Sequence, residues 1–314
     1  MLFKTNSLIL KSICIILPIH NEEANIKLVA AAIQQAVQQN YSLLLVDDGS
    51  TDNSLQVIEE LAHQNERVKS ISLSRNFGHQ NAIMAGLQHV TGDYFIIMDC
   101  DGQHPASVLP EMIQQLEAGF DLVNTCRTKT ENIGFVKKRL SAIFYWVINL
   151  ISDIKIKPNQ ADFRAFNKKV LDSILQFNER ELFLRGMFSW IGFKTTTINF
   201  TAPARLHGKT KYSLKKMFRL ALKGITSFSY KPLRVALLIG TFISIISFAF
   251  GIYALIEYFK HQTVRGWPSL IIAVMFLGGT QLLAIGLLGE YIAGIFSETK
   301  KRPIYLINKK INID

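Results

Sequence analysis

The chain has 314 residues, of which 49% are apolar, with a formal net charge of +11 at pH 7 and a mean hydropathy of +0.20. That length suffices for one large domain or two smaller ones. The spacing of Cys14, Cys100 and Cys126 suits no zinc site, and their odd number argues against a disulfide framework. We expect no signal peptide, because Lys11 splits the N-terminal apolar stretch, and therefore predict a reduced, cytosolic catalytic domain.

Short apolar runs alternate with helical patterns along the first 130 residues. We expect strands at residues 12–18, 43–47, 68–73, 94–99 and 121–125, and helices at residues 24–39, 79–89 and 106–117, with another helix around Leu55, Ile58 and Leu61. Alternation at this spacing predicts a parallel sheet built of βαβ units. The expected fold class is therefore α/β, with a nucleotide-binding half at the N-terminus.

Polar clusters follow four of the expected strands. They are His20-Asn21-Glu22, Asp47-Asp48-Gly49-Ser50, Arg75-Asn76 and the segment from Asp99 to Gln103. Parallel sheets bind ligands just beyond the carboxyl ends of their strands. We therefore expect the four clusters at one edge of the sheet, where they would line a ligand site.

Asp99 and Asp101 close the fourth strand with one residue between them. Two carboxylates at such a turn can converge on one hard cation, and Gln103 offers a neutral oxygen within reach. Mg2+ and Mn2+ prefer oxygen ligands, and substrate phosphates often complete their coordination. The alternative is a solvated turn, since an isolated Asp-x-Asp is common. The strand before the motif and Gly102 and Pro105 after it favour the metal site.

Glu22, Asp47 and Asp48 have two interpretations. A carboxylate at the end of a strand can accept hydrogen bonds from a base or a ribose hydroxyl. Asp-Gly-Ser is also good turn chemistry, so we expect one Asp of the pair to cap and the other to bind. The sequence contains no P-loop and no Gly-x-Gly-x-x-Gly, so a kinase-like or Rossmann dinucleotide site is unsupported.

Two uncharged runs lie near the C-terminus. Val235–Ile256 and Gly266–Gly289 hold 22 and 24 residues, and each is long enough to cross a hydrocarbon core of roughly 30 Å as a helix. The alternative is a pair of buried helices in a soluble core, which rarely stay uncharged for so long. We therefore predict two transmembrane helices.

Basic residues surround these runs. No Asp or Glu lies between Glu181 and Glu257, a stretch that holds eleven Lys or Arg, and residues 300–302 are all basic. The positive-inside rule then predicts that both chain ends are cytoplasmic, with a short outer loop at residues 258–265 that itself holds two basic residues. Nucleic acid is the rival partner for such charge, but the charge abuts a membrane span and carries no nucleic-acid motif. We expect a membrane and no nucleic acid.

Two further segments have membrane-surface character. Residues 135–151 fit an interfacial helix or a core helix with a basic first turn. Residues 212–228 have the pattern of a basic amphipathic helix, and their place beside a transmembrane run favours the membrane surface. The predicted organisation is a catalytic domain at residues 1–210, an amphipathic segment at 211–232, a transmembrane hairpin at 233–296 and a basic cytosolic tail at 297–314.

Eight segments carry a family resemblance: IILPIHNEEANI, LLLVDDGSTDNS, SRNFGHQNAIMAGL, MDCDGQHP, ADFRAFNKKV, RGMFSWIGF, RLHGKTKYS and SFSYKPLR. In this order they resemble the family 2 glycosyltransferases that make polyprenyl-phosphate sugars, a group that includes dolichyl-phosphate mannose synthase and the bactoprenol glucosyltransferases. GEYIAGIFSETKKRPIYLI resembles the C-terminal signature of the bacterial, two-span members. The resemblance covers nearly the whole chain, and its motifs are highly specific as a set.

The resemblance implies a glycosyltransferase A fold and a metal-dependent, inverting transfer with Mn2+ or Mg2+. The residues that match positions around the base and ribose are Pro18, His20, Glu22, Val46, Asp47 and Asp48. Those that match the metal and diphosphate site are Asp99, Asp101 and Gln103, with Cys100 between the two carboxylates. Arg127, Arg205 and Lys211 match basic residues near the donor phosphates and the acceptor. Asp162 matches an acidic residue at the sugar and acceptor that is often discussed as a base.

Four positions depart from the family pattern. His20 stands where Tyr is frequent, which leaves base stacking open. Cys100 replaces the usual Ala with another small residue, and His104 stands where Asp is also common. Thr210 replaces the usual Ser before Lys211 and keeps the hydroxyl.

The expected reaction is transfer of a hexose from a nucleotide sugar to polyprenyl phosphate on the cytoplasmic face of a membrane. UDP-glucose is the first expectation, because the C-terminal signature resembles the glucosyl members; GDP-mannose, UDP-GlcNAc and a modified arabinose stay open. Undecaprenyl phosphate follows from the bacterial character of the tail. The acceptor phosphate is already anionic, so we expect Asp162 to orient the sugar or acceptor. The resemblance also implies a homo-oligomer, with a tetramer known among relatives.

Two other functions fit less well. A polysaccharide synthase of the same fold usually needs more spans to build an export channel. A non-catalytic membrane scaffold would not need the intact set of Asp99, Asp101, Gln103 and Asp162.

Overall fold

The computed structural model describes residues 11–128, 160–180, 182–203, 229, 231–259 and 266–313. The chain divides into two compact units. Unit 1 comprises residues 1–145, 156–213 and 302–314, and unit 2 comprises residues 146–155 and 214–301. The predicted surface helices at 135–151 and 212–228 lie outside the described residues, and the predicted domain boundaries stay predictions.

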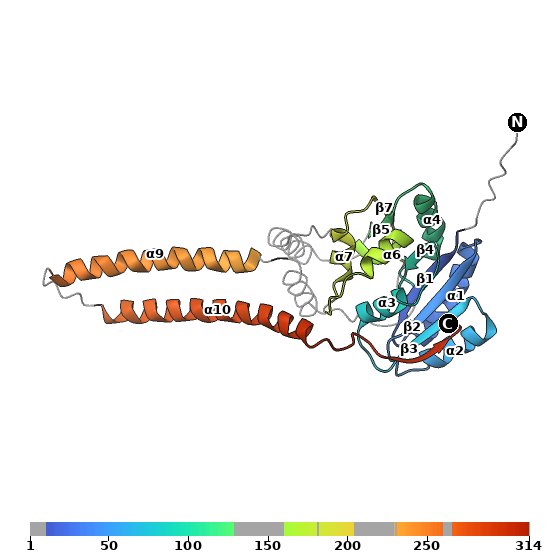
Figure 1. The fold of residues 1–314 in the computed structure, drawn as a ribbon, viewed down its shortest axis with the longest axis horizontal. Coiled ribbons are helices and arrows are strands. Elements are labelled where there is room, and N and C mark those ends of the chain that lie inside the picture. Colours follow the sequence, from blue (N-terminus) through green and yellow to red (C-terminus); the bar gives the residue numbers. More distant parts are fainter. Residues whose placement is uncertain are drawn as a thin grey trace, which may run out of the picture. The chain divides into compact units, whose positions relative to one another are not determined.

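Unit 1 is built on a sheet (Figure 1) that has eight strands in the order β7-β5-β6-β4-β1-β2-β3-β8. The strands are β1 (Ile13–Ile19), β2 (Tyr41–Asp47), β3 (Val68–Leu73), β4 (Tyr94–Ile97), β5 (Leu122–Arg127), β6 (Gln160–Asn167), β7 (Thr195–Phe200) and β8 (Ile307–Ile311). β4, β1, β2 and β3 pair in parallel, as do β5 and β7, whereas β6 and β8 run antiparallel to their neighbours. The predicted α/β fold with a mostly parallel sheet is confirmed.

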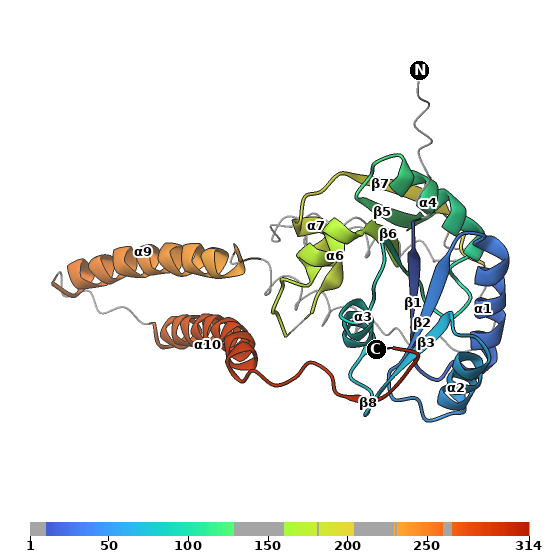
Figure 2. The same ribbon diagram turned by 45° about the vertical axis from the view of Figure 1, so that its right-hand side comes forward.

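Helices cover both faces of this sheet (Figure 2). They are α1 (Glu23–Ala36), α2 (Ser54–Gln64), α3 (His79–Leu87), α4 (Leu109–Glu117) with the short η1 (Ala106–Val108) before it, α6 (Lys168–Ile174) and α7 (Leu184–Trp190). On one face, Ile15 and Leu17 of β1 share a core with Ile26 of α1. On the other face, Ile16 packs so closely against Gly86 of α3 that a Cβ there would lie 2.6 Å from its methyl group. Burial on both faces explains why these strands are continuous apolar runs.

The reversed direction of β6 decides where its first residues lie. β6 pairs antiparallel with β4, and Ile97 at the end of β4 lies opposite Arg164. Continuing this register past its last pair sets Asp162, near the start of β6, opposite Asp99, which follows β4. A residue from the middle of the chain therefore reaches the edge where the parallel strands end.

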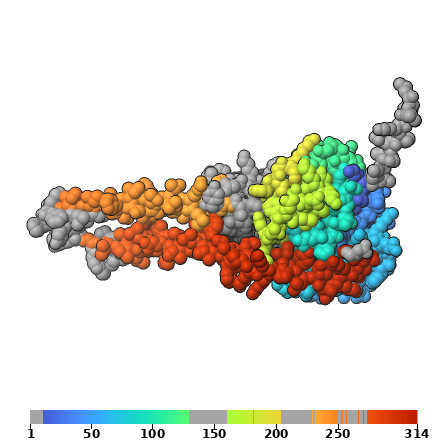
Figure 3. Space-filling view, in the orientation of Figure 1, coloured from blue at the N-terminus to red at the C-terminus, as the bar shows by residue number. Residues whose placement is uncertain are grey.

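The chain returns to unit 1 after its apolar helices. The sequence pattern predicts a basic tail at residues 297–314, whereas the structure places β8 there, antiparallel to β3. In the space-filling view the red residues near the C-terminus lie against the blue residues of unit 1 (Figure 3). Ser74 N–H donates to the Leu306 carbonyl at 2.9 Å, and the Asn312 side-chain amide donates to the carbonyls of Ala62 and Val68 at 2.7 and 2.8 Å. Short edge strands that carry lysine are common in sheets, and their weak apolar pattern is easily taken for a tail.

Unit 2 contains two long helices, α9 (Lys231–Phe259, 29 residues) and α10 (Trp267–Thr299, 33 residues). Both are long and apolar enough to cross a membrane, with mean hydropathies of 1.9 over Lys231–Ala249 and 1.5 over Ala273–Thr299. Their apolar side chains are exposed, Phe248 to 72% and Leu283 to 78%. Exposed apolar surface of this extent is typical of a membrane or protein–protein interaction surface.

Gly49, in the loop after β2, permits a close approach of two loops. Its φ is +60°, and a Cβ there would lie 2.3 Å from the carbonyl carbon of Arg75 and 2.5 Å from the nitrogen of Asn76. Gly119 is a matched control, because its φ of +87° is also left-handed but a Cβ there would meet none of the described residues within 4 Å. Left-handed strain of about 1 kcal/mol applies to both Ala variants.

We expect Gly49→Ala to cost about 1–3 kcal/mol more in unfolding free energy than Gly119→Ala, because two backbone segments must separate. Thermal unfolding of the full chain in detergent measures the difference. Equal losses for the two variants would contradict the close approach.

Candidate active site

Three of the four polar segments predicted at one edge of the sheet contact one another. Asn76, after β3, donates its side-chain amide to His20 Nε2 at 2.9 Å, and His20 Nδ1, after β1, lies 3.0 Å from the carbonyl oxygen of Asp48. Since a carbonyl can only accept, Nδ1 carries the proton and Nε2 accepts from Asn76. His20 is therefore held through both nitrogens between the loops that follow β2 and β3.

Asp47 and Asp48 both hold backbone groups. Asp47 accepts the Ser50 N–H at 3.2 Å and closes the turn after β2. Asp48 accepts the N–H groups of Phe77 and Gly78 at 2.7 and 3.0 Å and so holds the entry to α3. Burial raises the pKa of both carboxyls, and these hydrogen bonds partly offset the increase. The structure thus gives both residues a capping role, and binding of the nucleotide by either one stays a prediction.

The other predicted nucleotide residues, in β1, just after it and in β2, lie against the core or at a helix start. Pro18 and Val46 are buried and pair directly between β1 and β2. Glu22 precedes α1, its N–H donates to Ser54 Oγ at 2.9 Å, and its Oε2 accepts from Asn25 at 2.6 Å. Contact of these three with a nucleotide base also stays a prediction.

The Asp99–Gln103 turn is built around His104. The Asp99 N–H donates to His104 Nδ1 at 2.9 Å, and Asp101 Oδ1 accepts the Gln103 N–H at 3.0 Å. The His104 ring is buried and stacks on Phe163, with ring centroids 4.9 Å apart. Burial lowers the pKa of His104, and Asp99 only partly offsets this decrease. The ring therefore stays neutral, and its Nδ1 can accept the hydrogen bond from the Asp99 backbone N–H.

Cys100 points into the core between the two carboxylates. It is 2% exposed, and burial raises the pKa of its thiol, with the nearby carboxylates adding to the effect. An un-ionised, buried thiol is a poor metal ligand and nucleophile. Cys100 therefore acts as a small core residue of the turn.

The oxygens of the turn fit a divalent cation. Asp99 Oδ1 is buried and accepts no hydrogen bond from any residue that the structure describes; His79 Nε2, at the start of α3, lies 3.4 Å away. Within the described ranges no group of three or more His, Cys, Asp or Glu side chains forms a closed metal cage. Mg2+ and Mn2+ need no such cage, because one or two carboxylates and substrate phosphates usually hold them.

Arg127, at the end of β5, joins this turn. Its Nη1 donates to Gln103 Oε1 at 3.3 Å, and its Nη2 lies 3.4 Å from His104 Nε2. A guanidinium in this position is placed to bind phosphate oxygens next to the carboxylates. The structure therefore groups four of the predicted residues: Asp99, Asp101, Gln103 and Arg127.

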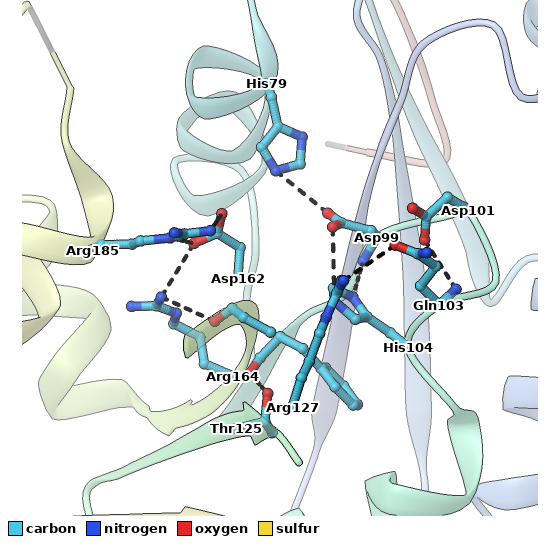
Figure 4. Close-up of polar contacts among 12 residues, drawn as sticks. His79, Asp99, Asp101, Gln103, His104, Thr125, Arg127, Asp162, Arg164 and Arg185 are labelled. Carbon is cyan, nitrogen blue, oxygen red and sulfur yellow. Dashed lines mark hydrogen bonds and ion pairs between the residues drawn. The ribbon is translucent and has the colours of Figure 1, made fainter. Parts of the chain in front are cut away.

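Asp162 lies in a cluster with two arginines (Figure 4). Arg185 of α7 donates from Nε to Oδ1 and from Nη2 to Oδ2, both at 2.8 Å, and Arg164 of β6 donates to Oδ1 at 3.3 Å. Burial alone would raise the pKa of Asp162, but Arg185 and then Arg164 outweigh it and hold this pKa well below its usual range. The carboxylate is therefore ionised at neutral pH.

Arg164 is among the largest fully buried side chains, and its guanidinium lies 4.5 Å from the Phe188 ring centre. Burial lowers its pKa to about 10, with the Asp162 carboxylate opposing the shift. Two arginines around one carboxylate leave this cluster with a net positive charge, which favours an anion beside it.

Four residues of the site were not among the predicted site residues: His79, His104, Arg164 and Arg185. Three of them carried a signal. Arg164 shares a strand face with Asp162 by its spacing of two, His104 follows the Asp-x-Asp turn, and Arg185 lies in the basic stretch. Arg205 and Lys211, two predicted phosphate-binding residues, lie outside the described residues.

A parallel-rich sheet with paired carboxylates at its carboxyl edge is the architecture of α/β proteins that bind ligands beyond the ends of their strands. Residues 14–175 match the family Glycosyl transferase family 2, and residues 231–295 match the family GtrB C-terminal hairpin. The chain belongs to glycosyltransferase family 2, with the glycosyltransferase A fold, and is a glycosyltransferase.

Curated relatives are similar over nearly the whole chain. The glycosyltransferase YkcC of Bacillus subtilis is 39% identical over 96% of this chain and 94% of its own. The bactoprenol glucosyl transferase of Shigella phage SfX is 38% identical over 95% of this chain and 99% of its own. The prophage bactoprenol glucosyl transferase homolog of Escherichia coli is 38% identical over 95% and 98%.

A solved structure of glucosyl-3-phosphoglycerate synthase from Mycobacterium tuberculosis, in complex with Mn2+, UDP-glucose and phosphoglyceric acid, has a TM-score of 0.48 and 18% identity. The match covers 69% of this chain and 78% of that chain. A likeness this distant says nothing about what the present chain binds.

The lowered pKa of Asp162 predicts how the loss of stability in Asp162→Asn depends on pH. A carboxylate whose folded pKa lies below its unfolded value of 3.8 stabilises the fold above that value and loses this effect as the pH falls through the folded pKa. We expect Asp162→Asn to cost about 3–5 kcal/mol, because it leaves two arginines without their counter-charge. The loss should be constant above about pH 5 and shrink only below about pH 4.

Thermal unfolding of the full chain in detergent measures this loss, with the exposed Asp172→Asn as the control for removing a surface carboxylate. A loss that changes between about pH 6 and about pH 8 would contradict the assignment, since it would mean that Asp162 titrates there.

Proposed function

We propose that this glycosyltransferase transfers a hexose, with UDP-glucose as the favoured donor, to undecaprenyl phosphate with inversion at the anomeric carbon. The observation that carries the proposal is identity of 38% over nearly full length with proteins named bactoprenol glucosyl transferases. The match extends through the C-terminal hairpin, so it includes the segment that would meet a lipid. GDP-mannose or another UDP-sugar is the alternative donor.

Asp99, Asp101 and Gln103 would hold Mn2+ or Mg2+ together with the donor diphosphate. When bound, such a cation neutralises the charge that builds on the leaving nucleoside diphosphate. Arg127, 3.3 Å from Gln103, would bind the same phosphates, and Arg205 and Lys211 are proposed for the donor and acceptor phosphates. The loops that carry His20, Asp47 and Asp48 would hold the nucleoside.

The acceptor phosphate supplies its own nucleophile. One of its anionic oxygens attacks the anomeric carbon from the face opposite the diphosphate; the new carbon–oxygen bond forms as the bond to the diphosphate breaks, and the nucleoside diphosphate leaves with the electron pair. No proton needs to be removed, so a strong base is not required. Asp162, held ionised between Arg164 and Arg185, suits a role in orienting the sugar or acceptor.

Membrane attachment would bring this chemistry to the lipid headgroup. The exposed apolar surfaces of α9 and α10 favour insertion as a hairpin. The chain on both sides of the hairpin continues into unit 1, through β7 before it and β8 after it, which supports emergence of both ends on the same side. The basic residues 300–302 favour the cytoplasmic side.

The experiment uses membranes that express the full chain, with undecaprenyl phosphate, Mn2+ and, in parallel, radiolabelled UDP-glucose, UDP-GlcNAc and GDP-mannose. We expect label from one donor, UDP-glucose first, to move into the organic phase. Asp101→Ala should reduce the transfer at least about 100-fold, because one of two carboxylates at the cation is lost. Asp172→Ala, which removes an exposed carboxylate on α6, should leave transfer unchanged. No label with any donor from folded protein would contradict the proposal.

Removal of divalent cations tests the predicted cofactor. A chelator in excess should abolish transfer in the same membranes, and Mn2+ or Mg2+ should restore it, since the oxygen ligands of Asp99, Asp101 and Gln103 suit either ion. Binding of Mn2+ to the purified chain, followed by its paramagnetic resonance, should weaken in Asp101→Ala. Full transfer in the presence of the chelator would contradict a metal at this site.

A further inference from the structure

We infer that Arg185, on α7, is a positioning residue of the glycosyl transfer, which fixes the Asp162 carboxylate so that one of its oxygens faces the bound sugar. This inference rests on the proposed function, because it assigns a task within that reaction. Arg185 lies outside the Asp-x-Asp turn and outside the predicted phosphate-binding residues, so the role is additional to theirs.

The geometry of the pair fixes the carboxylate in both position and plane. Nε and Nη2 of Arg185 reach Oδ1 and Oδ2, respectively, at the same distance of 2.8 Å. Two parallel bonds from a rigid guanidinium hold a carboxylate in one plane, which a single bond cannot do. Asp162 therefore has its orientation set from α7, across from its own strand.

The two oxygens of the Asp162 carboxylate accept different numbers of hydrogen bonds. Oδ1 accepts from both Arg185 and Arg164, whereas Oδ2 accepts only from Arg185 among the residues that the structure describes. The side chain is 18% exposed, so it is not fully enclosed. Oδ2 thus keeps a lone pair, which suits a hydroxyl of the donor sugar.

Other charged or titratable groups near this pair come from Asp162's own strand and from two further segments. They are Arg164 on β6, His79 at the start of α3 and His104 after β4. Arg185 is the strongest of the groups that keep the carboxylate ionised, ahead of Arg164. Without Arg185, burial would act against the charge with less opposition, and the pKa of Asp162 would rise.

The test compares wild type, Arg185→Gln and Arg185→Lys in the transfer assay, with the donor that wild type uses. We expect kcat/KM to fall about 10- to 100-fold in Arg185→Gln, while the Kd of the donor stays nearly unchanged, because a misaligned group costs rate more than affinity. The ratio of variant to wild-type kcat/KM should fall further as the pH goes from about 8 to about 5, because Asp162 then takes up a proton. Using the ratio cancels the titration of the acceptor phosphate.

Arg185→Lys separates charge from geometry. Lysine keeps the positive charge but lacks the planar fork, so kcat/KM should fall while its ratio to wild type stays flat with pH. Lys27→Gln is the matched control, because it removes the cation of an exposed pair with Glu60 at 3.2 Å and should leave kcat/KM unchanged.

A double-mutant cycle with Asp162→Asn completes the test. If Arg185 acts through Asp162, Arg185→Gln should add little to the loss already caused by Asp162→Asn, both in kcat/KM and in the thermal midpoint. Additive losses in kcat/KM, or a flat pH ratio for Arg185→Gln, would overturn the inference while wild-type transfer still supports the proposed function. Absence of transfer by wild type would instead contradict the proposed function, and the thermal midpoints would then still test the pair. If Arg185→Gln does not fold, the cycle is made with Arg185→Lys and Asp162→Asn, and additive losses in kcat/KM would then overturn the inference.

Discussion

The antiparallel pairing of β6 with β4 is the constraint on which the site depends. In a purely parallel sheet, the start of β6 would lie at the far edge, and Asp162 would be a strand length away from Asp99. Because β6 runs in the opposite direction, Asp162, near its start, lies at the edge where the parallel strands end. The register from Ile97 and Arg164 then sets the two carboxylates opposite each other. The diphosphate and the sugar of a bound nucleotide sugar could thus be contacted from neighbouring strands.

The charged residues of the site form two groups. On one side, Asp99 and Asp101 supply oxygen ligands, with one buried oxygen that no described residue hydrogen-bonds. On the other side, Arg164 and Arg185 both bind the Asp162 carboxylate, so two positive charges and one negative charge leave this cluster net positive. Negative charge suits a cation with the donor diphosphate, and positive charge suits an anionic acceptor. A carboxylate that is clamped in this way orients a substrate more readily than it accepts a proton.

Much of this arrangement could be predicted from the sequence, and the failures have physical causes. Strands buried on both faces, the Asp-x-Asp turn and the two apolar helices are local patterns, so composition and period reveal them. Contacts between distant segments produce no local sequence pattern. Arg185, for example, contacts Asp162, which lies 23 residues earlier in the chain. β8 was not predicted from the sequence, because an edge strand needs few apolar residues. Asp47 and Asp48 were expected to divide capping and binding, yet both hold backbone amides, which only the folded loops could show.

The most direct test of hexose transfer to a lipid phosphate is the stoichiometry of the reaction, followed by phosphorus NMR on the purified full chain with undecaprenyl phosphate and UDP-glucose. The lipid phosphomonoester signal should convert to a phosphodiester, with one nucleoside diphosphate released for each phosphodiester formed. Release of a nucleoside monophosphate, with a diphosphate-linked lipid as the product, would mean that a sugar phosphate is transferred. Release of nucleoside diphosphate with an unchanged lipid signal would mean that the acceptor is not the lipid phosphate. Either result would contradict the mechanism.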